Sequence, residues 1–133
     1  MPITGLLMDE NFNIVIVDLP GDDVLREMYE LLNCSYVEVI ACDGFDMWID
    51  DEGRIGEDRV INTLASIAAS RPIFGHAWLV GQDGGSMKSL SMNQIREAAN
   101  GGMVLGPSFS LPEVREARLE GNWWLDGKDL VTA

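Results

Sequence analysis

The sequence predicts an α+β fold: a mostly antiparallel sheet of about five strands, with two longer helices packed on it and short helices near the C-terminus. One observation behind this class is the order of apolar patterns, in which pairs of strands alternate with single helices. Another is the length of the connectors between paired strands, which is that of hairpin turns. The chain has 133 residues, the size of one domain, so we expect residues 1–133 to form a single domain.

A hairpin and a helix are predicted at the N-terminus. The apolar runs Ile3 to Met8 and Asn13 to Asp18 are separated by a short polar connector, which is typical of a β-hairpin. A Leu-Pro-Gly break ends the second strand, and Asp22 or Asp23 can then cap a helix. The apolar residues of this helix recur on one face: Val24, Leu25, Met28, Leu31 and Leu32.

A second hairpin is predicted in the middle of the chain. Ser35 to Cys42 is apolar on both alternating faces, so we expect a central strand that is buried on both sides. Asp43 and Gly44 form a strong two-residue turn signal, and Met47 to Ile49 makes the returning strand.

The second half of the chain predicts helices and one strand. A helix is expected from about Glu57 to Ala69, and a strand from Phe74 to Val80 that ends in a glycine-rich turn. A capping box at Ser91 opens a helix over Met92 to Ala99. A last helix is expected from Pro112 to Leu119.

The predicted strands and the second helix need one another to bury their apolar faces. We therefore expect one shared core, built from Val37, Val39, Ile49, Leu64, Ile67, Trp78 and Val80. Cys34 and Cys42 have no CxxC spacing and no neighbouring histidine, and we expect buried, reduced thiols.

Charge is distributed unevenly along the chain. The net charge is −13, and the first 58 residues contain 15 acidic and only two basic residues. Such a field repels phosphate backbones and anionic lipids, so we expect neither nucleic-acid binding nor membrane binding. No apolar run approaches the roughly 18 residues needed to span a bilayer, and we expect a cytoplasmic protein. Because the chain is strongly negative, we expect basic proteins as its partners. Acidity that merely keeps a small protein soluble is the alternative.

The middle of the chain resembles a known family. The stretch from Tyr36 to Leu90 contains Y-V-E-V-I, then W-I-D-D-E-G-R, then a helix with Asn62, then P-I-F-G-H-A-W-L-V-G and a polar turn. It resembles the family called domain of unknown function 3846, small proteins common in phages, plasmids and their bacterial hosts. The resemblance supplies no catalytic residues. It implies a mobile-element setting, in which short acidic inhibitors and ligand-sequestering proteins are frequent.

The favoured hypothesis is a non-enzymatic accessory protein that inhibits a basic host or defence protein through an acidic surface able to mimic nucleic acid. Electrostatic complementarity would speed the association and make it sensitive to salt. No cofactor is expected. The predicted partner-binding face consists of acidic residues of the first half: Asp22, Asp23, Asp43, Asp46, Asp50, Asp51 and Glu52.

Two other functions stay open. An oligomeric protein that sequesters a nucleotide signal would use glycine turns, arginines and tryptophans of the second half. We expect a homo-oligomer because two adjacent indoles are difficult for a short tail to bury. The residues concerned are Trp123, Trp124, Arg115 and Arg118. The third class is a metal-assisted hydrolase built on the aspartates between positions 43 and 52, whose order does not match an EF-hand. His76 is the only histidine, so at most one imidazole base or ligand is available.

Overall fold

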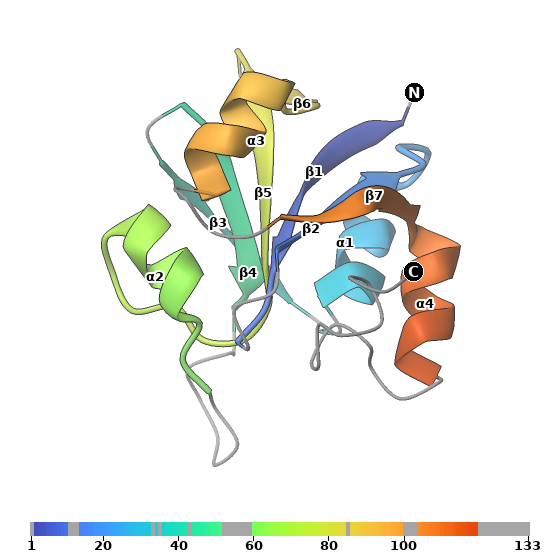
Figure 1. The fold of residues 1–133 in the computed structure, drawn as a ribbon, viewed down its shortest axis with the longest axis horizontal. Helices are drawn as coiled ribbons and strands as arrows, with labels where there is room; N and C mark the ends of the chain where they lie inside the picture. Colours follow the sequence, from blue (N-terminus) through green and yellow to red (C-terminus); the bar gives the residue numbers. More distant parts are fainter. Residues whose placement is uncertain are drawn as a thin grey trace.

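The computed structural model describes residues 2–10, 14–32, 34, 36–42, 44–51, 60–84, 86–99 and 104–119. These residues form seven strands and four helices (Figure 1). In chain order the elements are β1 (Ile3–Met8), β2 (Ile14–Leu19), α1 (Val24–Leu32), β3 (Val37–Ala41), β4 (Asp46–Asp50), α2 (Thr63–Ala69), β5 (Ala77–Asp83), β6 (Ser86–Lys88), α3 (Met92–Ala99), β7 (Val104–Ser110) and α4 (Leu111–Leu119).

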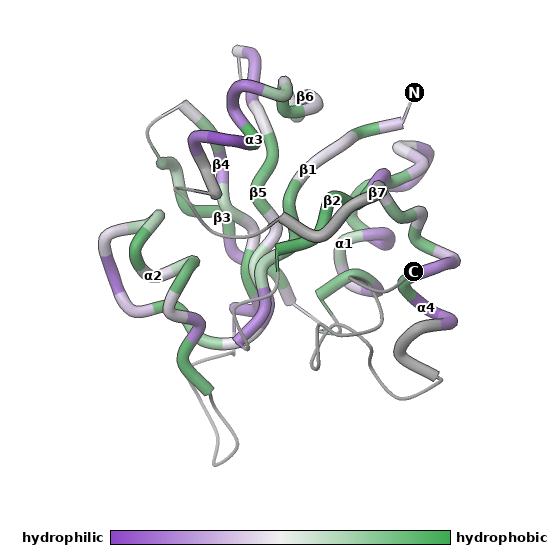
Figure 2. The backbone as a smooth tube through the Cα atoms, viewed as in Figure 1, coloured by the Kyte–Doolittle hydropathy of each residue, from purple (hydrophilic) through white to green (hydrophobic). Residues whose placement is uncertain are grey.

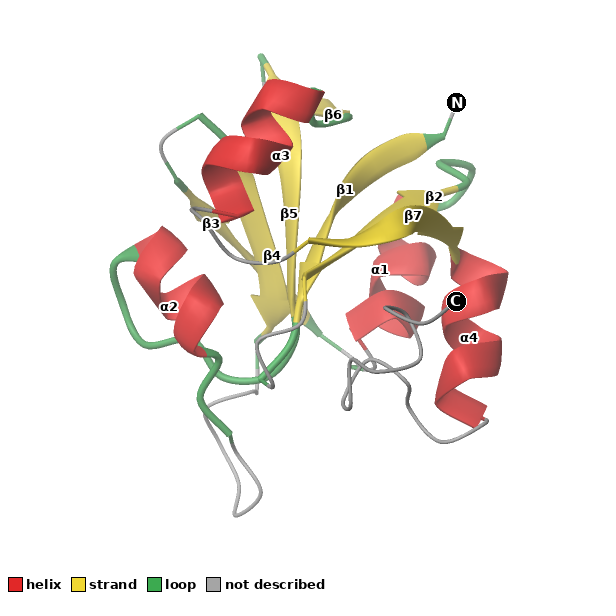
Figure 3. Ribbon diagram, viewed as in Figure 1, coloured by secondary structure: helices red, strands yellow, loops and turns green. Residues whose placement is uncertain are grey.

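All strands belong to one sheet, which confirms the α+β class and the mostly antiparallel pairing. The strand order is β3-β4-β5-β1-β2-β7, and β6 pairs with the end of β5 (Figure 3). Every pair is antiparallel except β2 with β7, which run parallel. The prediction of about five strands was wrong, because β6 and β7 were not expected.

Helices cover both faces of the sheet. Figure 1 shows α1 and α4 side by side on one face, whereas α2 and α3 lie on the other. The reason is the alternation of side chains along β1 and β5, which are apolar on both faces and therefore need cover on both. Figure 2 shows hydrophobic residues concentrated in these central strands.

The apolar residues accordingly form two clusters rather than the one predicted core. Trp78 and Val80 are buried against α1, and Ile49 is buried on the opposite face with α2 and α3. Two predicted core residues are exposed: Val39 by 47% and Ile67 by 60%. The prediction of a single core failed because neighbouring residues of one strand face opposite sides of the sheet.

The first hairpin and three of the four helices lie where the sequence placed them. The second helix begins at Thr63 instead of near residue 57, because Asn62 caps it and Ile61 forms an isolated bridge with Phe74. Residues 57–59 lie outside the described ranges. α1 and α4 are the two longest helices, with nine residues each. None of the helices in the described ranges has the length and apolar character needed to cross a bilayer.

The strand predicted to be central, β3, lies at one edge of the sheet with β4 as its partner. Its apolar residues are only partly covered, so a pattern that is apolar on both faces did not mean burial on both sides. β7 forms the opposite edge and contains Gly106 and Pro107. Proline is tolerated at a sheet edge, which explains why this stretch is a strand despite its composition.

Candidate functional site

A small acidic recess lies where β4 ends, beside the segment that follows α2. Its lining residues are Glu38, Asp50, Asp51, Arg71, Pro72 and Phe74, with buried Ile49 and Ile73 below them. The recess is partly open and its volume is about 20 Å³, which is room for one water-sized group. The recess therefore suits a compact ion or a side-chain head group.

The turn after α2 places Arg71 at this recess. Ser70 ends the helix in the left-handed conformation with φ 58°, and the Arg71 N–H donates to the Ser66 carbonyl at 3.2 Å. The Ser66 hydroxyl accepts a hydrogen bond from the Ile73 N–H at 2.8 Å. This turn returns the chain toward β3, where Arg71 Nη2 lies 3.3 Å from Glu38 Oε2.

The β3–β4 hairpin supplies the carboxylates. Its pairing continues to the end of β4, because the Asp51 N–H donates to the Tyr36 carbonyl at 2.9 Å. Glu38, Asp50 and Asp51 therefore lie at one end of the hairpin and line the recess together with one basic residue, Arg71, which pairs with Glu38. The Arg71–Glu38 pair is partly exposed and contributes little to stability. The site keeps an excess of negative charge that favours a cation.

Two of the predicted acidic residues share this recess and one does not. Asp50 ends β4 and Asp51 follows it, whereas Asp46 begins β4 at the opposite end of the strand. Asp43 and Glu52 lie outside the described residues.

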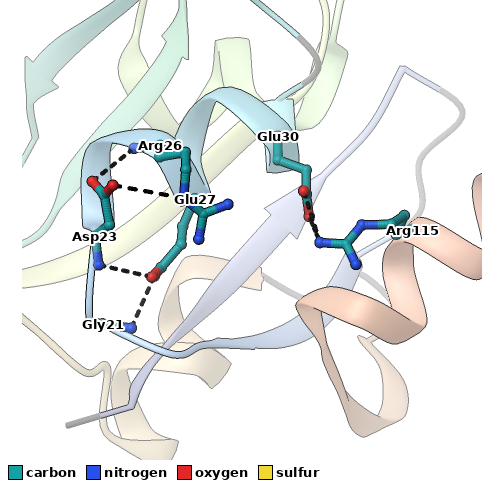
Figure 4. Close-up of polar contacts among 6 residues, drawn as sticks. All are labelled: Gly21, Asp23, Arg26, Glu27, Glu30 and Arg115. Atoms are coloured by element: carbon teal, nitrogen blue, oxygen red, sulfur yellow. Dashed lines mark hydrogen bonds and ion pairs between the residues drawn. The ribbon is translucent and has the colours of Figure 1, made fainter.

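The other two predicted acidic residues precede α1, which follows β2 three strands away from β4. Asp22 is exposed. Asp23 caps the helix as predicted, since its Oδ1 accepts a 3.4 Å hydrogen bond from the Arg26 N–H. Buried Glu27 completes the cap, because its carboxylate accepts from the N–H groups of Gly21 at 2.8 Å and Asp23 at 3.0 Å (Figure 4). This pair of aspartates is thus separate from the recess.

Arg115 links α4 to α1. Its Nη2 lies 2.8 Å from both carboxylate oxygens of Glu30 (Figure 4). Arg115, which was predicted to contact a ligand or another subunit, is thus paired with a carboxylate of the same chain. The side chain of Arg118, together with Trp123 and Trp124, lies outside the described residues, so self-association through the tryptophans stays a prediction.

Two half-buried thiols flank the hairpin. They are free, as predicted, but they are less buried than expected. Burial, and then the Asp50 carboxylate, raise the pKa of Cys34 to about 11. Burial and the Asp46 carboxylate also raise the pKa of Cys42, while Arg71 lowers it. The pKa of each thiol therefore depends in part on a carboxylate at one end of β4.

Replacing Asp50 with asparagine should make Cys34 more reactive. The thiolate is the reactive form, and a pKa near 11 leaves little of it at about pH 8. The Asp50→Asn variant removes the charge that helps to raise this pKa, so we expect alkylation of Cys34 by iodoacetamide to accelerate severalfold. Mass spectrometry would resolve the two sites, and Cys42 is the internal control. Equal acceleration at both thiols would instead indicate a loosened fold.

A buried polar cluster at the end of β1 was not predicted. Asp9 is 2% exposed, Asn62 is buried, and Glu10 Oε1 lies 3.5 Å from His76 Nδ1. Burial raises the pKa of Glu10. Since His76 precedes β5 and Asp50 ends the antiparallel β4, this cluster lies at the same end of the sheet as the recess. The only sequence signal was an Asp-Glu pair directly after an apolar strand. Within the described ranges, no three His, Cys, Asp or Glu residues gather to hold a metal ion.

A family model described as domain of unknown function (DUF3846) matches residues 3–101. The chain belongs to the DUF3846 family. The match extends well beyond Tyr36 to Leu90, beginning at β1 and ending just after α3. The acidic recess lies within the DUF3846 region, whereas β7 and α4 lie beyond it. No curated protein and no solved structure matches the chain.

Proposed function

We propose that this protein binds a basic protein and blocks its basic surface, with a lysine side chain of the partner entering the acidic recess at the end of β4. The observation that carries this proposal is the composition of the recess. Its lining includes three acidic residues, Glu38, Asp50 and Asp51, and one basic residue, Arg71, around a water-sized space. A lysine ammonium is a compact charge of this size, whereas a nucleotide is far larger.

The surrounding charge favours the same kind of partner. The whole chain carries a net charge of −13, and its first 58 residues, which include Glu38, Asp50 and Asp51, contain 15 acidic and only two basic residues. A negative field of this kind accelerates the approach of a basic surface and discourages nucleic acid. A host or defence protein that binds nucleic acid through such a surface would be inhibited, which suits the mobile-element setting implied by the family resemblance.

Neutralising the recess should weaken binding of a basic probe more than removing the same charge elsewhere. The probe is fluorescent hexalysine, and binding is followed by anisotropy at about 0.05 M and 0.15 M salt. We expect the Asp50→Asn, Asp51→Asn double variant to bind about tenfold more weakly at the lower salt concentration, mainly through slower association. The matched control is Asp83→Asn with Glu97→Gln, which removes two exposed carboxylates and should cost less than about twofold.

Equal losses in the two double variants would mean that net charge alone attracts the probe, and the recess would have no special role. Unfolding midpoints measured in parallel show whether each variant keeps its fold. Undiminished binding by the recess variant would contradict the proposal directly.

A further inference from the structure

The outer edge of β3 offers hydrogen-bonding groups to a partner. β3 stands at the end of the strand order and pairs with β4. In an antiparallel pair, residues alternate between those that bond to the partner strand and those whose N–H and C=O point away from it. The phase of this alternation therefore identifies the outward groups.

Two hydrogen bonds set that phase. The Cys42 N–H donates to the Phe45 carbonyl at 2.9 Å, and the Asp51 N–H donates to the Tyr36 carbonyl at 2.9 Å. The even-numbered residues of β3 consequently bond to β4. The backbone groups of the odd-numbered residues point outward, and these residues are Val37, Val39 and Ala41.

β3 has no proline, lysine or bulge, and its one charged residue, Glu38, is paired with Arg71. Exposed edges are commonly protected by proline, β-bulges or charged side chains, especially lysine. The opposite edge strand, β7, contains Gly106 and Pro107, and its pairing with β2 has a register shift. β3 reads Val-Glu-Val-Ile-Ala, with Val39 exposed by 47% and the preceding Tyr36 by 60%. In the part of the chain that the structure describes, no further strand pairs with this edge, which leaves it open to strand addition.

The side chains on the two sides of β3 differ. Val37, Val39 and Ala41 face the α1 side, whereas Glu38 and Ile40 face the α2 side, next to the recess. An added strand that alternates apolar and basic side chains would match both. A second copy of this chain would instead set two acidic edges against each other, and like charges on neighbouring strands are destabilising.

We propose that an extended segment of the basic partner adds to β3 as a new edge strand, with its basic side chains directed to the recess. This inference rests on the proposed function and specifies how the partner is held. Main-chain hydrogen bonds to Val37, Val39 and Ala41 supply affinity, and the carboxylates select the charge.

Two peptides of equal charge, of which only one can pair as a β-strand, distinguish strand addition from electrostatic attraction alone. The probes are Lys-Val-Lys-Val-Lys-Val-Lys and Lys-Pro-Lys-Pro-Lys-Pro-Lys, the second of which cannot form a β-ladder. The variant Val39→Pro removes one outward N–H without touching the bonds to β4, and Val39→Ala is its matched control. We expect the valine peptide to bind Val39→Pro at least about tenfold more weakly than Val39→Ala. The proline peptide should bind both variants equally and weakly.

Amide hydrogen exchange of the full chain provides the second readout. We expect the amides of Val37, Val39 and Ala41 to exchange rapidly in the free protein and slowly with the valine peptide, while Glu38 and Ile40 stay protected throughout. Slow exchange of these amides in the free protein would overturn the inference. If the exchange rate depended on protein concentration, a second copy would cover the edge. If it did not, a segment of the same chain would cover it. Equal binding of both peptides, unaffected by Val39→Pro, would overturn strand addition and leave the recess proposal standing. No binding of either peptide at about 0.05 M salt would overturn both.

Discussion

Replacing Gly5 with alanine should destabilise the protein by about 3 kcal/mol, at the upper end of the cost of overpacking. Gly5 lies in β1, between β2 and β5. A Cβ at this position would lie 2.6 Å from Trp78 Cζ2 and would also clash with the Leu79 carbonyl oxygen. The indole is fully buried and the oxygen belongs to a central strand, so neither can move without disturbing the sheet. Urea unfolding followed by tryptophan fluorescence would measure the loss.

Gly84→Ala is the matched control for Gly5→Ala. Gly84 has φ +58° and nothing within 4 Å of an added Cβ, so the only cost is that of the left-handed conformation, about 1 kcal/mol. A smaller loss at Gly5 than at Gly84 would show that the clash with Trp78 is relieved by a minor shift.

Replacing Asn62 with alanine should cost about 3 kcal/mol or more. The buried amide joins three parts of the fold: its Nδ2 donates to the Met8 carbonyl at 3.0 Å and the Gly75 carbonyl at 2.8 Å, and its Oδ1 accepts from the Ala65 N–H at 3.0 Å. The substitution removes a helix cap, worth about 1 kcal/mol. It also leaves two carbonyl groups without this partner, at about 1 kcal/mol or more each.

The control for Asn62→Ala is Ser91→Ala at the start of α3. Ser91 Oγ accepts from the Gln94 N–H at 3.1 Å at an exposed helix end, so this variant should lose only the capping contribution, about 1 kcal/mol. The difference between the two losses, measured by urea unfolding, reports the bonds that Asn62 makes to β1 and to the segment before β5. If the two variants lose equal stability, Asn62 acts only as a cap.

Local features were predictable because their determinants are close in the sequence. The first hairpin followed from two apolar runs and a short polar connector, and the cap at Asp23 and the capping box at Ser91 each involve residues only three apart. The second helix was predicted too long because Val60 and Ile61 continue its apolar spacing. In the structure they precede the cap at Asn62 and are exposed by about half.

The position of β3 and the existence of β7 depended on distant partners. β3 is as apolar as a central strand, but its place at the edge is decided by which strands pair elsewhere in the sheet. β7 carries glycine and proline, and it forms beside β2, about 90 residues earlier in the chain. A short window of sequence contains no information on either pairing, because the decisive hydrogen bonds connect residues far apart.

The candidate site was also predictable only in part, for the same reason. The amino-acid sequence by itself determined the concentration of negative charge in the first half, the hairpin that carries Asp50 and Asp51, and the class of the fold. Only the tertiary structure brought Glu38 and Arg71 beside those aspartates and separated Asp22, Asp23 and Asp46 from them. The physical reason is that charge and turn preference are properties of single residues and near neighbours, whereas a recess is made where separate strands and loops meet.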